Sequence, residues 1–87
     1  MPKVTVYSSD FCPFCRRAKA LLTSKGVVFE EICVDGRSDV RAEMAARAGR
    51  NTVPQIWIGE RHIGGCDDLH ALDDAGELDG LLAVTHA

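Results

Sequence analysis

The hydrophobic residues of this chain follow two periods, one typical of strands and one typical of helices. Short runs rich in β-branched and aromatic residues, such as Val4-Thr5-Val6-Tyr7, predict strands. Two of these runs enclose a two-residue turn, where Gly59 supplies the positive φ of a type II′ hairpin. The expected strands are residues 4–7, 27–34, 55–58 and 61–63.

Apolar residues spaced three and four apart predict helices between these strands. Pro13 suits the first position of the first helix, and Gly26 ends it. The expected helices are residues 13–25, a segment capped by Ser38 or Asp39 and ended by Gly49, a segment from about Cys66, and residues 77–84. Their inward-facing residues include Ala18, Leu21, Leu22, Val40, Met44 and Ala48.

The order of these elements predicts an α/β fold with the sequence β-α-β-α-β-β-α. Two strands joined through a helix form a right-handed unit with parallel strands. A hairpin adds antiparallel strands, so we expect a four-stranded mixed sheet flanked by helices. At 87 residues, the chain is expected to form a single domain over residues 1–87.

Composition and charge exclude several classes of partner. The net charge is −3, whereas a chain that neutralises phosphates usually has a basic surface, so nucleic acid is not expected. No apolar run approaches the roughly 20 residues that a membrane span needs. The N-terminus also lacks the apolar stretch of a secretory signal, which predicts a cytoplasmic protein.

The four cysteines limit the possible chemistry. In a reducing compartment, disulfides are usually transient and catalytic. A structural zinc site is the alternative, but it usually needs a second close pair of ligands after Cys12 and Cys15. Cys33 and Cys66 stand alone, so redox chemistry is favoured over a metal site. Cys33 lies in an expected strand and is predicted to be a small buried residue.

Cys12 and Cys15 lie between the first strand and the first helix. A helix N-terminus offers free N–H groups and a partial positive charge, which stabilise a thiolate. Cys12 takes the N-cap position and is therefore the expected nucleophile. Cys15 lies one turn further on and closer to the interior, where it can resolve a disulfide formed by Cys12.

Three sequence blocks resemble the glutaredoxin family, and especially its small bacterial dithiol members. They are CPFCRRAKALL from Cys12, TVPQIWIG from Thr52 and GGCDDL from Gly64. The likeness extends from about residue 3 to residue 83. It implies a thioredoxin fold with a glutathione-binding groove.

The resemblance also implies roles for individual residues. Pro54 would follow a cis peptide bond, and the Val53 backbone would pair with the cysteinyl part of glutathione. The amides of Cys66 and Asp67 would bind the γ-glutamyl carboxylate. The Asp67 carboxylate, or Asp67 together with Asp68, would face the ammonium group. Ser9 and Phe14 stand where relatives often carry lysine and tyrosine, which weakens the expected binding. The implied glutathione-binding residues are Phe14, Arg41, Thr52, Val53, Pro54, Gly65, Cys66 and Asp67.

The implied function is glutathione-dependent reduction of protein disulfides and protein–glutathione mixed disulfides by a monomer. Glutathione would be a co-substrate, with no permanently bound cofactor or metal. Glutathionylated proteins and ribonucleotide reductase are the expected protein substrates. Two alternatives stay open: a redoxin reduced by thioredoxin reductase, and a homodimer that binds an iron–sulfur cluster through Cys12 and glutathione.

Overall fold

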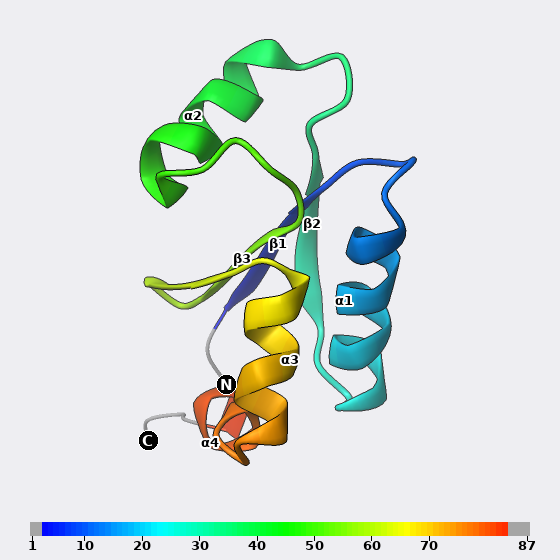
Figure 1. Ribbon diagram of the computed structural model, residues 1–87, viewed down its shortest axis with the longest axis vertical. Coiled ribbons are helices and arrows are strands. Elements are labelled where there is room, and N and C mark those ends of the chain that lie inside the picture. The colour runs from blue at the N-terminus through cyan, green and yellow to red at the C-terminus, as the bar shows by residue number, and fades with distance from the viewer. Residues whose placement is uncertain (1–2, 84–87) are drawn as a thin grey trace.

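The computed structural model describes residues 3–83 and contains a four-stranded sheet with the strand order β2-β1-β3-β4 (Figure 1). β1 pairs in parallel with β2 and antiparallel with β3, and β3 pairs antiparallel with β4. This arrangement confirms the predicted mixed sheet. The elements are β1 (Val4–Ser8), α1 (Pro13–Ser24), β2 (Phe29–Cys33), α2 (Ser38–Ala48), β3 (Gln55–Ile58), β4 (Arg61–Gly64), α3 (Cys66–Asp74) and α4 (Leu78–Ala83).

The sheet separates two hydrophobic cores because successive strand residues point to opposite faces. The larger core packs α1, α3 and α4 against one face, and Leu22 and Leu69 are fully buried in it. The smaller core packs Met44 of α2 against Tyr7 and Trp57 on the other face. α1 and α3 lie close together (Figure 1), and their N-termini point the same way, toward the level of α2.

The helices are short, with 12 residues in α1, and none within residues 3–83 is long and apolar enough to cross a membrane. α1 begins at Pro13 and is followed by Gly26 at φ 73°, as predicted. The predicted cap of α2 is wrong, because its N-cap is Arg37 and no side chain caps it. A turn in which Arg37 N–H donates to Val34 O starts this helix earlier than the sequence indicates.

The chain between α1 and β2 also differs from the prediction. β2 begins at Phe29, because Val27 N–H is bonded to Leu22 O at the end of α1. Cys33 is half-buried rather than buried, because β2 is an edge strand. The turn between β3 and β4 is confirmed, with Gly59 at φ 62°. α4 starts at Leu78, and Val84, the predicted last residue of this helix, lies outside the described residues.

Candidate active site

Cys12 is the N-cap residue of α1, as predicted. Its Sγ accepts a hydrogen bond from the backbone N–H of Cys15 at 3.1 Å. The first N–H groups of a helix have no partner within the helix and carry a partial positive charge. A thiolate at Cys12 therefore receives both a direct hydrogen bond and the field of the helix.

Cys15 is the inner thiol of the pair, with 0% of its surface exposed compared with 8% for Cys12. Burial raises the pKa of Cys15 to about 12, and a hydrogen bond with Cys12 adds to this shift. All four cysteines are free thiols. Cys12 is therefore the more accessible of the two thiols, and Cys15 lies behind it.

A short extended segment lies opposite Cys12. The Val53–Pro54 peptide bond is cis, which confirms the geometry implied by the family resemblance. The Cys12 thiol lies 3.6 Å from the Val53 carbonyl oxygen, to which it can donate. Backbone groups on this segment are therefore available to a peptide-like ligand that reacts at Cys12.

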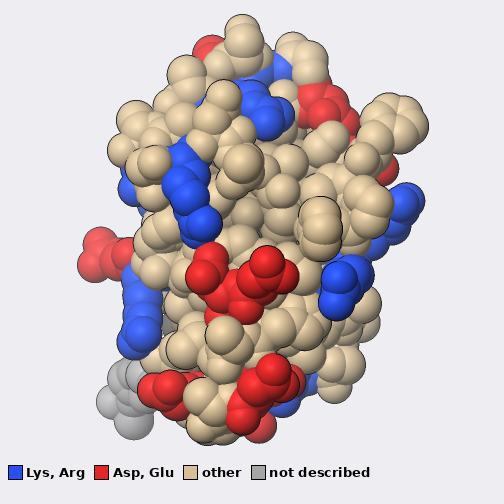
Figure 2. All heavy atoms as spheres, in the orientation of Figure 1, with Lys and Arg blue, Asp and Glu red and all other residues tan. Residues whose placement is uncertain are grey.

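A groove beside Cys12 brings together most of the predicted binding residues. Its floor and walls come from the start of α1, the segment before β3 and the N-terminus of α3. Figure 2 shows acidic side chains gathered over the N-terminal end of α3, with basic side chains on both sides. The lining residues are Phe14, Arg50, Thr52, Val53, Pro54, Gly65, Cys66, Asp67 and Asp68.

Arg41 is the predicted binding residue that does not line this groove. Its guanidinium donates to the Asn51 side chain at 3.0 Å and to the Asn51 carbonyl oxygen at 2.9 Å. Asn51 directly precedes Thr52, which does line the groove. In this conformation Arg41 holds the segment that leads to the groove.

Arg50 also lines the groove but was not predicted to bind, and Asp68 was expected only as a second carboxylate beside Asp67. Arg50 pairs with Asp68 at 3.0 Å, and Asp68 also accepts from Gly65 N–H at 2.9 Å. These contacts lower the pKa of Asp68, with the Gly65 N–H as the larger cause. A Cβ at Gly64, which has a φ of 120°, would overlap both the Asp68 carboxylate and the Arg50 guanidinium. The absence of a side chain at Gly64 therefore leaves room for the Arg50–Asp68 ion pair.

Asp68→Ala is expected to destabilise the fold at pH 7 by about 0.5–1 kcal/mol, because it removes the capping bond to Gly65. The pKa of Asp68 is lowered in the folded state, so this contribution is present above its ordinary value of 3.8. It is lost as the pH falls through the folded pKa. Chemical denaturation at several pH values measures the difference. Asp67→Ala is the control, and equal losses in both variants would contradict the prediction.

Cys66, the first residue of α3, lines the groove. Its side chain is buried, and its Sγ lies 3.4 Å from His70 Nδ1. Burial raises the pKa of the Cys66 thiol. These features favour a packing role for the side chain and leave the backbone amide at the start of α3 for binding.

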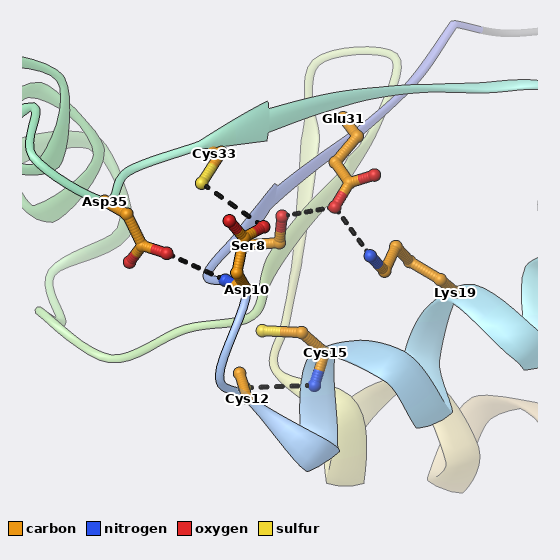
Figure 3. A network of polar contacts seen from close by, with 8 residues as sticks. All are labelled: Ser8, Asp10, Cys12, Cys15, Lys19, Glu31, Cys33 and Asp35. Atoms are coloured by element: carbon orange, nitrogen blue, oxygen red, sulfur yellow. Dashed lines mark hydrogen bonds and ion pairs between the residues drawn. The ribbon is translucent and has the colours of Figure 1, made fainter.

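One group of possible metal ligands lies near the cysteine pair within residues 3–83 (Figure 3). The ligand atoms of Asp10, Cys33 and Asp35 all lie within 4.8 Å of one another. However, Asp35 already accepts from the Ser9 hydroxyl at 2.7 Å and from Asp10 N–H at 2.8 Å. These bonds lower the pKa of Asp35, with Ser9 as the first cause. We therefore assign these three residues a structural role, in which Asp35 stabilises the loop between β1 and α1 that carries Cys12.

Sequence comparisons identify the family. The glutaredoxin family model matches residues 4–63. The chain is 61% identical over 84 residues to glutaredoxin of Pseudomonas aeruginosa, covering 97% of this chain and 100% of that protein. It is 58% identical over 82 residues to glutaredoxin 3 of Escherichia coli K12, covering 94% of this chain and 99% of that protein.

Structural comparison agrees and confirms the thioredoxin fold. The buckwheat glutaredoxin–glutathione complex matches with a TM-score of 0.86 and 33% identity, covering 93% of this chain and 76% of the other. Sequence, fold and the cysteine pair at the start of α1 therefore lead to one identification. The chain belongs to the glutaredoxin family of thiol–disulfide oxidoreductases.

Proposed function

We propose that this chain uses glutathione to reduce protein–glutathione mixed disulfides and protein disulfides. The observation that carries the proposal is the groove between Val53, opposite Cys12, and the N-terminus of α3. A similar chain, buckwheat glutaredoxin, has been solved in complex with glutathione. Glutathione is then a co-substrate that enters and leaves during each turnover.

The groove fits the chemical groups of glutathione. The Val53 backbone pairs with the cysteinyl part, which brings the glutathione sulfur to Cys12. The N–H groups of Cys66 and Asp67 at the start of α3 bind the γ-glutamyl carboxylate. The Asp67 carboxylate faces the ammonium group. The remaining contacts come from residues along the walls, namely Phe14, Thr52, Pro54 and Gly65.

Two arginines place positive charge beside the bound glutathione. Arg50 neutralises the negative charge of Asp68 at the γ-glutamyl end of the groove. This end therefore suits a group that carries both an ammonium and a carboxylate. Arg41 reaches the glycine carboxylate by exchanging its bonds with Asn51 for bonds to the ligand. Arg41 and Arg50 therefore act in different parts of the groove.

The first reaction needs Cys12 alone. The Cys12 thiolate attacks the glutathione sulfur of a mixed disulfide, and the protein leaves as a thiolate that takes up a proton. A second glutathione thiolate then attacks the same glutathione sulfur. This step releases glutathione disulfide and regenerates the Cys12 thiolate.

The second reaction needs both cysteines. The Cys12 thiolate attacks a protein disulfide and forms a mixed disulfide with one of its sulfurs. The Cys15 thiolate then attacks Cys12, which closes the Cys12–Cys15 disulfide and releases the second protein thiol. Two glutathione molecules restore both thiols and leave as glutathione disulfide. Phe11, 91% exposed beside Cys12, offers an apolar contact to such protein substrates.

Turnover of a small glutathione mixed disulfide tests the proposed reductant. We expect turnover with glutathione and glutathione reductase, and none with thioredoxin reductase alone. Turnover that requires thioredoxin reductase would overturn the glutathione assignment and favour a redoxin that thioredoxin reductase reduces. A brown product with iron and acid-labile sulfide after purification would favour the cluster-binding homodimer. Ribonucleotide reductase as a substrate stays a prediction.

Asp67→Asn is expected to raise the KM for glutathione about 1.4- to 5-fold, because an exposed ion pair contributes about 0.2–1 kcal/mol. kcat should change little, because the cysteine pair is untouched. Steady-state kinetics with varied glutathione measure both constants. Asp39→Asn removes the same charge from the first turn of α2 and is the control. An equal KM for Asp67→Asn and Asp39→Asn would contradict the assigned contact.

A further inference from the structure

The buried position of Cys15 makes it difficult for its thiol to lose a proton. In the proposed reduction of protein disulfides, Cys15 must lose its proton before it can attack Cys12. Its side chain is fully buried, and burial raises its pKa to about 12. A thiol of this kind is almost entirely protonated at neutral pH, so the reaction benefits from a nearby cation.

Lys19 lies in the right place to supply this cation. It follows Cys15 by four residues in α1, and residues with this spacing lie on the same face of a helix. Figure 3 shows both side chains on the face of α1 that is turned toward the sheet. The Lys19 side chain is 26% exposed, so solvent screens its charge only in part.

Glu31, whose carboxylate is itself bound by Ser8, holds the Lys19 ammonium in this position. Its Nζ lies 2.6 Å from Glu31 Oε2 on β2, and the same oxygen accepts from the Ser8 hydroxyl at 2.6 Å. Ser8 is fully buried at the end of β1. The bonds from Lys19 and then Ser8 lower the pKa of Glu31, which keeps this carboxylate ionised at neutral pH.

The charges around Cys15 act in opposite directions. Burial raises the pKa of Cys15 most, and a hydrogen bond with Cys12 and negative charge at Cys12 raise it further. A hydrogen bond with the Ser9 backbone and, as the smallest cause, the charge of Lys19 lower it. Once Cys12 is in a mixed disulfide, its sulfur is neutral, and the opposing charge is gone. Lys19 and the Ser9 backbone then act on Cys15 without this opposition.

We propose that Lys19, held by Glu31 and Ser8, is a positioning residue for the resolving step, in which it favours the Cys15 thiolate. The Cys15 thiol gives its proton to water, and its sulfur attacks Cys12. The bond between Cys12 and the substrate breaks, and the substrate thiolate leaves and takes up a proton. Lys19 thus supports the reaction that needs two cysteines and is dispensable for the reaction that needs only Cys12. The inference rests on the roles of Cys12 and Cys15 in the proposed function.

The test uses a neutral aromatic disulfide, 2,2′-dithiodipyridine, and the reduced full chain in a stopped-flow instrument. Attack by Cys12 releases the first thiopyridone, and attack by Cys15 on the mixed disulfide releases the second. We expect Lys19→Gln to slow the second release about 3- to 10-fold, and to leave the first within about 2-fold. In Lys19→Gln, the rate of the second release should also rise with pH over a higher pH range than in the wild type. Lys19→Arg, which keeps the charge, should restore the wild-type profile.

Lys3→Gln is the matched control, because Lys3, which directly precedes β1, pairs at 3.1 Å with Glu30, the neighbour of Glu31 in β2. An unchanged second release in Lys19→Gln would overturn the inference. Equal slowing of both releases, or equal slowing in Lys3→Gln, would overturn it as well. The assay contains no glutathione, so a failure of the proposed glutathione dependence would appear in the turnover assay and not here.

Discussion

Replacing Cys12 by serine should abolish turnover of a glutathione mixed disulfide. The loss is expected to be on the order of 10³-fold or more, because the variant lacks the nucleophile that carries glutathione in the intermediate. A serine hydroxyl at the N-cap of α1 still accepts the N–H of Cys15, so the fold is expected to be preserved. The measurement is the initial rate with glutathione and glutathione reductase.

Cys15→Ser is the matched control for this result. It removes a thiol of the same pair, yet turnover of the small mixed disulfide should stay close to that of the wild type, because this reaction needs Cys12 alone. Reduction of a protein disulfide should fall in both variants. A Cys15→Ser variant that is inactive with the small substrate, beside an active Cys12→Ser, would reverse the assigned roles.

Leu22→Ala should lower the free energy of unfolding by about 2–5 kcal/mol. Leu22 is fully buried between α1 and the sheet, so the change removes apolar contacts and leaves a cavity in the larger core. For a domain of this size, about 3 kcal/mol corresponds to a fall in Tm of roughly 12–24 °C. Calorimetry and urea denaturation measure the two quantities.

Leu21→Ala is the control in the same helix. Leu21 is only partly buried at the edge of the same core, and the substitution has the same effect on helix propensity. Its expected cost is about 1 kcal/mol. Similar losses in both variants would show that the cost arises from α1 itself and not from packing against the sheet.

Much of the fold could be predicted from local sequence. The apolar periods, Pro13 and Gly59 act within a few residues, and the structure places their elements as expected. The start of α2 could not be predicted, because a turn that ends at Arg37 decides it and neighbouring Ser38 and Asp39 are equally good caps by composition. The burial of Cys33 depends on which strand lies at the sheet edge, which local sequence does not specify.

The candidate site could be predicted only in part. Cys12 and Cys15 are visible from their place between a strand and a helix, whereas the groove was inferred from the family resemblance. Arg50 was missed because its partner, Asp68, lies in another element 18 residues away. The pair of Lys19 with Glu31 depends in the same way on how α1 lies against β2. Contacts of this kind follow from packing and leave no periodic signal.

The division of the interior into two cores has a consequence for spectroscopy. Trp57 is the only tryptophan of the chain, and it lies in the smaller core with Tyr7 5.4 Å away and the Arg47 guanidinium 4.7 Å above its ring. Its fluorescence therefore reports loosening around α2 and is insensitive to loosening confined to the larger core. Circular dichroism in the far ultraviolet follows the helices of both cores. Coincident transitions by the two methods would mean that the two halves of the interior unfold as one cooperative unit.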